Sequence, residues 1–253
     1  MSRFDDLVAE AAAAPITGWD FSWLDGRATE ARPSWRYRDG VAERAARSNA
    51  LLEIECGDGT LLRSLRTRPA LVVATEAYQP GPDTVCARAD ELPCRNDAFD
   101  LVISRHPVVA HWDEIARVLL RGGTYFAQHV GPRSAAEISE WFLGPQRHSD
   151  DRSPDRAQRE AERVGLTVTD LRHEALPMTF DDVGAVVYFL RLVVWIVPGF
   201  RVERYRDRLQ ALHRHIAEHG PFRATSTRFL IEARKGTASA VSPAASRHHG
   251  PGC

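Results

Sequence analysis

Acidic residues stand at the ends of two short apolar runs in the first third of the chain. Glu53 and Glu55 end the first run and lead into Gly57 and Gly59. Glycines there let the backbone approach a ligand closely, and a helix that begins after them favours a negative group. Glu76 ends the next run. An acid about 20 residues beyond a glycine loop is placed to accept hydrogen bonds from the ribose hydroxyls of a nucleoside. Together these residues predict a nucleoside-binding site.

Two histidines follow later apolar runs and are the candidates for proton transfer. His106 stands before a proline, and His129 lies within the letters AQHVG. A neutral imidazole at either place could accept a proton from an amine or hydroxyl while that group is alkylated. For His106 the alternative is a hydrogen bond to loop backbone. Asp113 and Glu114 open an expected helix, where carboxylates serve the positive end of the helix dipole.

Substrate contacts are expected from an aromatic N-terminal stretch and from an apolar segment with helical spacing. Trp23 and Trp35 belong to a polar stretch rich in aromatic rings, which is either a surface arm packed on the domain or a lid over a ligand. Tyr188 and Arg191 lie in the apolar segment, where core packing is the alternative. A charge there needs a partner, because an unpaired buried charge is costly. An anionic substrate group or Asp182 would supply one.

From residue 50 the chain alternates short apolar runs with amphipathic segments. Such continuous runs are typical of strands buried on both faces, as in a parallel sheet. Strands that alternate with helices favour a doubly wound α/β fold with right-handed crossovers. In that fold, ligands bind at the carboxyl ends of the strands. The expected strands are 50–56, 70–76, 84–88, 100–106, 124–130, 166–172 and 226–234, and the expected helices are 2–13, 58–65, 111–120, 134–142, 155–164, 183–197 and 201–218.

Three parts are expected along the chain. Residues 1–47 form an N-terminal helix and an aromatic arm or lid, and residues 48–235 form the α/β domain. A helical cap is inserted in that domain at about 177–220. Residues 236–253 form a tail whose composition predicts disorder.

Composition narrows the class of protein. A formal net charge of −1 over 253 residues gives no reason to expect a nucleic-acid or anionic-membrane partner. The four cysteines show no CxxC spacing, so we expect no metal site and no disulfide framework, and a cytoplasmic location fits best. The N-terminus does not resemble a secretory signal, and the most apolar run, 183–197, is too short to span a bilayer. We therefore expect a small-molecule substrate, and we leave open a homodimer or a partner protein.

Four stretches, in order, resemble the motifs of class I S-adenosylmethionine (SAM) methyltransferases. LLEIECGDGTLL is similar to their glycine loop, and VVATEAY to the acidic end of their second strand. ARADELPCRNDAFDLVISRH resembles their segment from the adenine-binding acid to the fourth strand, and EIARVLLRGGTYFAQHVG their fifth-strand region. The resemblance covers about residues 48–131. It implies a mostly parallel, seven-stranded Rossmann-like sheet and SAM as the cofactor.

The resemblance also implies roles for individual residues. Glu76 would hold the ribose, Asp90 and Glu91 would face the adenine, and His106 would lie beside the methyl acceptor. The flanking letters RATEARPSW, DDVGAVVYFLR and VPGFRVERY more closely resemble actinobacterial methyltransferases of the mitomycin aziridine N-methylating type. That likeness implies a substrate from natural-product or antibiotic biosynthesis.

Glu55 departs from the family pattern, because it replaces the first glycine of Gly-x-Gly-x-Gly. That glycine lies against the methionine part of SAM, which carries a carboxylate. A second carboxylate about 4 Å away costs roughly 4 kcal/mol at an effective dielectric of 20, or about a thousandfold in affinity. The cost disappears if Glu55 turns away, pairs with an arginine such as Arg27, or is protonated. Glu53 in place of aspartate and Arg121 in place of proline are milder changes.

Three functions are consistent with these features. The first is transfer of a methyl group from SAM to a small-molecule nitrogen or oxygen, with His106 as the base. The second keeps the fold without SAM. Its pocket, with Glu55, Glu76 and Asp90 unmasked, would orient an amine during an intramolecular ring closure such as aziridine formation, with loss of a leaving group such as sulfate. The third is a non-catalytic partner subunit.

Overall fold

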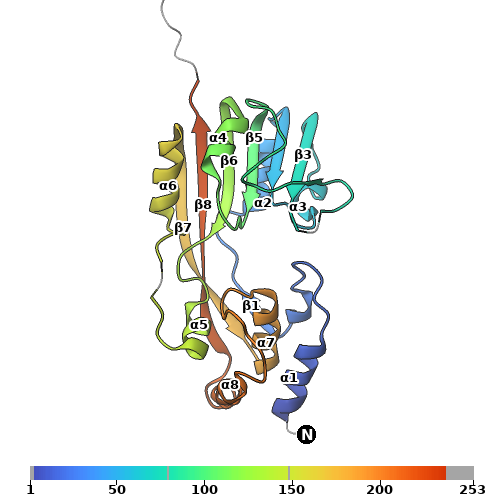
Figure 1. Cartoon of the computed structure of the whole chain (residues 1–253), viewed down its shortest axis with the longest axis vertical. Helices are drawn as coiled ribbons and strands as arrows, with labels where there is room; N and C mark the ends of the chain where they lie inside the picture. Colours follow the sequence, from blue (N-terminus) through green and yellow to red (C-terminus); the bar gives the residue numbers. More distant parts are fainter. Residues whose placement is uncertain (1–2, 79, 148, 238–253) are drawn as a thin grey trace, which may run out of the picture.

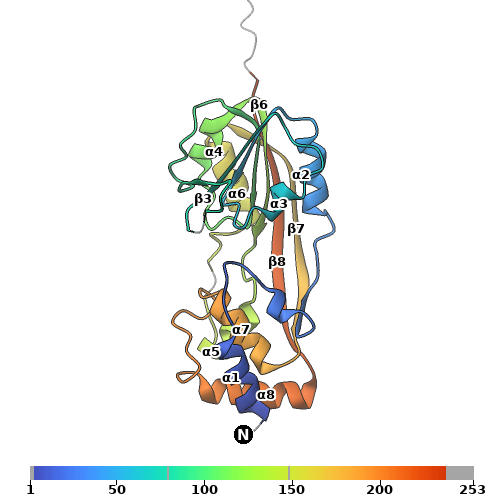
Figure 2. The ribbon, with the colours of Figure 1, turned by 90° about the vertical axis from the view of Figure 1, so that its right-hand side faces the viewer.

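The computed structural model describes residues 3–78, 80–147 and 149–237, which form two lobes along one long axis (Figure 1). One lobe, the α/β lobe, contains most of the sheet, and the other, the helical lobe, is mostly helical. Strands β7 (Leu166–Phe180) and β8 (Phe222–Lys235) run through both lobes, as the perpendicular view also shows (Figure 2). The expected tail, 236–253, lies outside the described residues except for its first two positions.

All the strands belong to one sheet with the order β1-β7-β8-β6-β5-β2-β3-β4. Neighbours among β2 to β6 pair in parallel, whereas β1 with β7, β7 with β8, and β8 with β6 pair antiparallel. The expected seven-stranded sheet is therefore wrong by one strand. The N-terminal arm adds β1 (Ala28–Glu30) beside the end of β7, where it pairs with backbone groups that an edge strand leaves open.

Each of the seven expected strands is present, and the last three, β6 (Leu119–Val130), β7 and β8, are much longer than expected. The extensions of β7 and β8 mix polar and apolar residues, and Pro177 interrupts the strand signal of β7 because proline cannot donate to a ladder. Their pairing with each other nevertheless continues to Phe180 and Phe222. The remaining strands are β2 (Ala50–Ile54), β3 (Leu71–Glu76), β4 (Val85–Cys86) and β5 (Phe99–Arg105).

Helices cover both faces of the sheet in the α/β lobe. One face packs under α2 (Tyr37–Ala45) and α3 (Thr60–Arg63), and the other under α4 (Trp112–Val118) and α6 (Pro154–Arg163). Sequence patterning did not predict α2. Its Gly40 lowers helix propensity, but a Cβ at this position would come within 2.8 Å of the Phe126 ring, so the close packing of α2 on the sheet requires glycine.

The helical lobe has its own apolar core. It contains α1 (Arg3–Ala13), the short η1 (Ser22–Leu24), α5 (Ala136–Leu143), α7 (Val183–Leu192) and α8 (Arg206–His219). The expected cap at about 177–220 thus supplies only α7 and α8. Helix α7 is shorter than expected because Val193 already leaves the helical backbone conformation. In the described part of the chain, no helix is both long and apolar enough to cross a membrane.

The carboxyl ends of the parallel strands face the helical lobe. Strand β8 begins in the helical lobe and ends at the far end of the α/β lobe, and β6 runs antiparallel to it. The loops after β2, β3 and β5 therefore open towards the helical lobe. Two non-glycine residues in these loops, Glu55 (φ 54°) and His106 (φ 60°), adopt the left-handed backbone conformation. Such conformations cost about 1–2 kcal/mol and persist where the surroundings enforce them, often at functional sites.

Candidate functional site

Glu76 connects the end of β3 to the glycine loop after β2. One carboxylate oxygen accepts the N–H of Gly57 at 2.9 Å, and the other accepts the N–H of Tyr78 at 3.0 Å. The side chain is buried. A Cβ added at Gly57 would meet no atom within 4 Å, so there is free space beside this glycine. The predicted acid and the predicted loop therefore meet at the carboxyl edge.

Glu55 bridges two of the loops at this edge. Its carboxylate accepts the N–H of Val108, which lies in the loop after β5, at 3.0 Å. Burial raises its pKa, the Val108 N–H opposes that shift, and the nearby Glu76 adds to it. Arg27, one of the partners considered for Glu55, instead pairs with Glu10. Glu55 therefore turns towards Val108.

Glu53 is a buried acid without a hydrogen-bond partner for one of its oxygens. The residue is 2% exposed, and its Oε2 atom accepts no hydrogen bond. Burial raises the pKa of Glu53 to about 8, and the positive charge of Arg105 limits the rise. An acid with that pKa is mostly neutral at pH 7, so Glu53 contributes little negative charge to the edge.

His106 is held by a chain of side-chain hydrogen bonds. The indole N–H of Trp35 donates to Gln128 Oε1 at 2.8 Å, and Gln128 Nε2 lies 2.8 Å from His106 Nε2. An indole N–H can only donate, so the Gln128 oxygen accepts from it and the Gln128 amide N–H₂ faces the imidazole. His106 Nε2 is then the acceptor, and in the neutral ring Nδ1 carries the hydrogen.

This arrangement disfavours His106 as a base. Its Nε2 lone pair is engaged by Gln128. Burial, followed by the charges of Arg228 and Arg105, lowers the pKa of His106 well below its ordinary value. The sequence predicted His106 at the site, and the structure places it there with a hydrogen-bond donor, Nδ1–H, as its available group.

The charged groups around His106 are cationic. Arg228, on β8, donates to Glu30 of β1 at 2.6 Å and to the Ser134 hydroxyl at 3.1 Å. Arg105 ends β5 and is exposed, and the part of the chain that the structure describes gives it no ion pair. The edge of the sheet is therefore positive after β5 and acidic after β2 and β3.

His129, the second candidate base, packs inside the α/β lobe. Its ring stacks on Phe229 with centroids 4.6 Å apart, and its Nε2 lies 3.2 Å from the Tyr125 hydroxyl. Burial lowers the pKa of His129 to about 3. These contacts make His129 a neutral core residue, and its predicted catalytic role gains no support from them.

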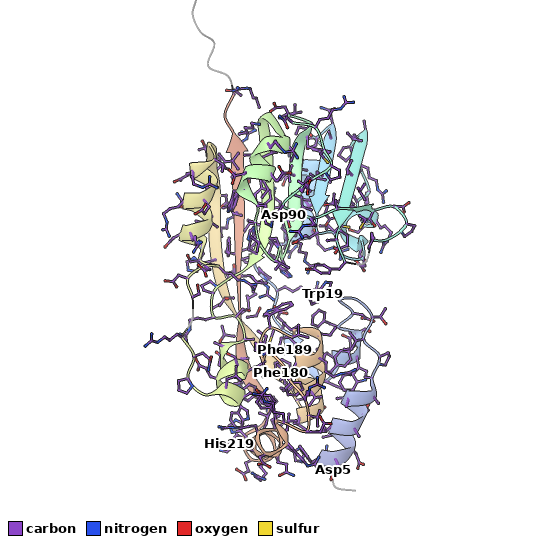
Figure 3. All side chains as sticks on the ribbon, in the orientation of Figure 1. Asp5, Trp19, Asp90, Phe180, Phe189 and His219 are labelled. Carbon is purple, nitrogen blue, oxygen red and sulfur yellow. The ribbon has the colours of Figure 1, made fainter. Side chains whose placement is uncertain are left out.

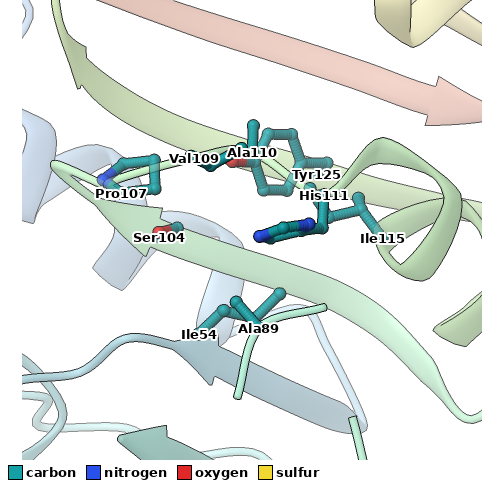
Figure 4. Close-up of a pocket in the computed structure, with 9 residues that line it drawn as sticks. All are labelled: Ile54, Ala89, Ser104, Pro107, Val109, Ala110, His111, Ile115 and Tyr125. Atoms are coloured by element: carbon teal, nitrogen blue, oxygen red, sulfur yellow. The ribbon is translucent and has the colours of Figure 1, made fainter. Parts of the chain in front are cut away.

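A small cavity lies under the loop after β5 (Figure 4). Its volume of about 10 Å³ is enough for roughly one water molecule. The Ser104 hydroxyl, which lines it, is buried and has no hydrogen-bond partner. The lining residues are Ile54, Ala89, Ser104, Pro107, Val109, Ala110, His111, Ile115 and Tyr125.

A larger groove of about 330 Å³ lies elsewhere, between α2 and the strands β7 and β8. Its charged walls neutralise one another: Arg44 pairs with Glu232, and Arg172 pairs with Asp170. Neither the glycine loop nor Glu76 lines it. Trp35, one of the expected substrate residues, lines this groove, whereas His106 does not.

The acids expected to face an adenine lie at the surface. Asp90 forms a two-bond ion pair with Arg88 at 2.8 and 2.5 Å, and Glu91 is exposed. The Arg88 pair holds the pKa of Asp90 at about 2. Their contact with an adenine stays a prediction.

Most of the expected substrate residues hold the N-terminal arm in place. Trp23 stacks on Tyr188 with centroids 4.7 Å apart, and the Tyr188 hydroxyl donates to the Pro15 and Asp20 carbonyls. Arg191 donates to the carbonyls at the end of α1, so its charge is accommodated without a ligand. Asp182, considered as its partner, instead accepts the N–H of Ala185 at the start of α7. Substrate contact by these residues stays a prediction.

Two exposed indoles face the edge from the helical lobe. Trp19 lies at the end of this lobe that points to the α/β lobe (Figure 3), and it packs against Trp195 with centroids 5.6 Å apart. Trp19 and Trp195 are 56% and 46% exposed, so both offer aromatic surface to a ligand between the lobes. The aromatic arm was expected to act as packing or as a lid; its rings pack on the helical lobe, and the lid role stays a prediction.

Sequence reasoning did not assign a role to Gln128, Ser104 or Arg105. Each lies at the carboxyl end of an apolar strand, where a polar side chain is unusual. That position was the available signal for Gln128, which is buried yet polar. Among the described residues, no cluster of histidine, cysteine or acidic side chains is arranged to hold a metal ion.

Comparisons with known proteins agree with this geometry. Residues 52–127 match a family model described as a methyltransferase domain. A search of curated proteins gives no match. A protein of Bacillus halodurans, proposed to be a methyltransferase, is 14% identical, with a TM-score of 0.55 over 79% of this chain and 99% of that chain. The YcgJ protein of Bacillus subtilis is 17% identical, with a TM-score of 0.54 over 80% and 99%.

A functionally unknown protein of Deinococcus radiodurans is also similar, with 12% identity and a TM-score of 0.52 over 82% of this chain and 90% of that chain. At these identities the likeness shows the fold. The chain therefore has the α/β methyltransferase fold, enlarged by the helical lobe.

This fold implies SAM as a cofactor, and the residues at the carboxyl edge of the sheet fit its nucleoside half. Glu76 and the free space beside Gly57 suit the ribose, because each carboxylate oxygen can accept a further hydrogen bond. The methionine half fits less well. The Glu55–Val108 hydrogen bond joins the loops after β2 and β5 and holds a carboxylate where the family has its first loop glycine.

Proposed function

We propose that the protein transfers a methyl group from SAM to a nitrogen or oxygen of a small molecule in specialised metabolism. The observation that carries the proposal is the contact between Glu76 and the glycine loop at an edge that faces the helical lobe. These residues lie in the stretch that matches the methyltransferase-domain model. Glu76 would hold the ribose, and SAM, when bound, supplies an activated methyl group.

In this function the chain contributes mainly position. Bringing two reactants together in line replaces a bimolecular encounter and accounts for much of the rate enhancement. The helical lobe would present the substrate, with Trp19 and Trp195 as aromatic surface. Gln128 holds His106 so that its Nδ1–H can orient an acceptor atom. A neutral amine that attacks through its lone pair needs no strong base at that moment.

A second candidate function keeps the fold and omits SAM. The Glu55–Val108 bond favours it, because the bond holds a carboxylate at the position where the family has the glycine that lies against the methionine half. In this function Glu55 and Glu76 would orient an amine while it displaces a leaving group within the same molecule. The new bond forms from the nitrogen lone pair, the leaving group departs with its bonding electrons, and a carboxylate accepts the ammonium proton. Burial raises the pKa of Glu55, which suits a proton acceptor.

Calorimetric titration with SAM tests the proposal, and Glu55→Gly separates the two candidates. Methyl transfer predicts SAM binding by the wild-type protein and up to about a thousandfold tighter binding by Glu55→Gly, as the carboxylate repulsion is removed. Absence of SAM binding at millimolar ligand by both proteins would reject methyl transfer. Glu203→Gly, a change at an exposed acid between α7 and α8, is the matched control.

A further inference from the structure

The free nitrogen of His106 is a hydrogen-bond donor without a partner. Gln128 engages Nε2, and among the described residues no hydrogen bond reaches Nδ1. Reversing this state would require the Gln128 amide to flip and to set its N–H₂ group against the Trp35 indole N–H. Two donors facing each other are unfavourable. Trp35 and Gln128 therefore act as positioning residues that keep the donor on Nδ1.

Two arginines act on this imidazole. The charges of Arg228 and Arg105 lower the pKa of His106. Arg228 is already neutralised by Glu30. Arg105 directly precedes His106 in the sequence, is exposed, and forms no ion pair with the described residues. A guanidinium without an ion pair and an imidazole N–H without a hydrogen-bond partner thus stand on consecutive residues at the end of β5.

We propose that the Nδ1–H of His106 and the guanidinium of Arg105 bind an anionic oxygen of the substrate, from a carboxylate, phosphate or sulfate group. Both groups are donors that favour a charged acceptor. The site lies at the carboxyl end of β5, where the edge faces the helical lobe. The inference rests on the proposed function in one respect, the position of the substrate between the lobes. An anionic group on the substrate is compatible with both candidate reactions.

Nitrogen-15 spectra of the histidine side chains test the state of His106, with His106→Gln to assign its signals. We expect the neutral form with hydrogen on Nδ1 from pH 6 to pH 8. In Gln128→Glu, a carboxylate would accept from both Trp35 and His106 Nε2, so we expect the pKa of His106 to rise by more than about one unit. Hydrogen on Nε2 in the wild-type protein would overturn the inference.

Titration with inorganic sulfate, phosphate and acetate tests the anion site. We expect a saturable shift of the His106 Nδ1 signal, with a dissociation constant on the order of millimolar, and at least about tenfold weaker binding in Arg105→Gln. Tighter acetate binding would indicate a carboxylate, and tighter sulfate or phosphate binding a tetrahedral group. Arg159→Gln, an exposed change on α6, is the matched control.

Two outcomes would reject the anion site: no saturable shift with any of the anions, or equal weakening in Arg105→Gln and Arg159→Gln. Circular dichroism of each variant verifies that it is folded. These measurements need neither SAM nor a turnover assay. If SAM does not bind, the result for the anion site therefore still stands. If no anion binds, the result for SAM likewise still stands.

Discussion

The carboxyl edge of the sheet has an acidic half and a basic half, and they are built differently. In the acidic half, Glu55 and Glu76 accept backbone N–H groups of neighbouring loops. In the basic half, His106 is held by Gln128, and Arg228 by Glu30 of the N-terminal arm. The acidic half thus depends on backbone groups of the loops at the edge, whereas the basic half depends on side chains of β6 and of the N-terminal arm.

The difference also concerns charge at neutral pH. Burial favours the neutral form of the acids and of the histidine alike. It raises the pKa of Glu53 to about 8 and lowers the pKa of His106. Glu53 and His106 are therefore mostly neutral at pH 7, and Arg105 is the exposed cation at the end of β5. A substrate with an amine near the acids and an anionic group near Arg105 would match both halves.

The largest effect is expected for Glu76→Ala. Loss of the carboxylate removes hydrogen bonds to the ribose, and we expect more than about a hundredfold weaker SAM binding in calorimetry. The Gly57 and Tyr78 N–H groups also lose their acceptor, which should lower the free energy of unfolding by about 2 kcal/mol. Unchanged affinity in a folded variant would contradict the role of the acidic half in ribose binding.

Glu53→Gln should change how stability depends on pH between the unfolded pKa of the acid and about 8. The folded-state pKa of Glu53, about 8, lies above its unfolded value, so the native state holds more protons between these values. The free energy of unfolding that the neutral Glu53 contributes is therefore present at low pH and is lost as the pH rises towards 8. We expect the stability of Glu53→Gln relative to wild type to increase by on the order of 4 kcal/mol between pH 4 and pH 9. Urea unfolding at several pH values measures it, and parallel curves would refute it.

His129→Phe should have the opposite effect, at acidic pH. The folded-state pKa of His129, about 3, lies below its unfolded value, so the unfolded state binds the extra proton. Stability is then present above about pH 6.5 and is lost as the pH falls towards 3. A phenylalanine would keep the stacking on Phe229. We expect a flatter acid limb in urea unfolding, and an unchanged limb would argue against a neutral, buried imidazole.

Glu30→Ala tests the dependence of the basic half on the arm. It removes the partner of Arg228 and the acceptor of the Ser226 hydroxyl. Because Glu30 is 39% exposed, solvent screens part of the loss, and we expect about 1–2 kcal/mol of destabilisation. Glu203→Ala, at an exposed position, is the control. Equal stability of the two variants would show that the arm does not support the basic half.

The smallest effect is expected for Asp90→Asn. Its pair with Arg88 is exposed, and exposed ion pairs contribute little to stability. We expect no measurable change in the midpoint of thermal unfolding. A change in SAM affinity without a change in stability would instead support the predicted adenine contact. Glu91→Gln provides the comparison at the neighbouring exposed acid.

The sequence by itself determined the strands, the glycine loop and the place of Glu76. Apolar runs of strand length mark buried parallel strands, and polar residues at their ends must meet at one edge because the strands are parallel. Periodicity did not predict α2 or β1. Helix α2 needs Gly40 for a tight contact with Phe126, and β1 is defined by its pairing with β7. Both depend on a partner distant in the sequence.

Only the tertiary structure decided what the site residues can do. The protonation state of His106 depends on Gln128, which lies 22 residues further along the chain. Gln128 is in turn oriented by Trp35, which lies 93 residues before it. The direction of Glu55 likewise depends on Val108, which lies 53 residues further along the chain. Residue type sets which hydrogen bonds a side chain can make, whereas the neighbours brought by folding decide which of them form.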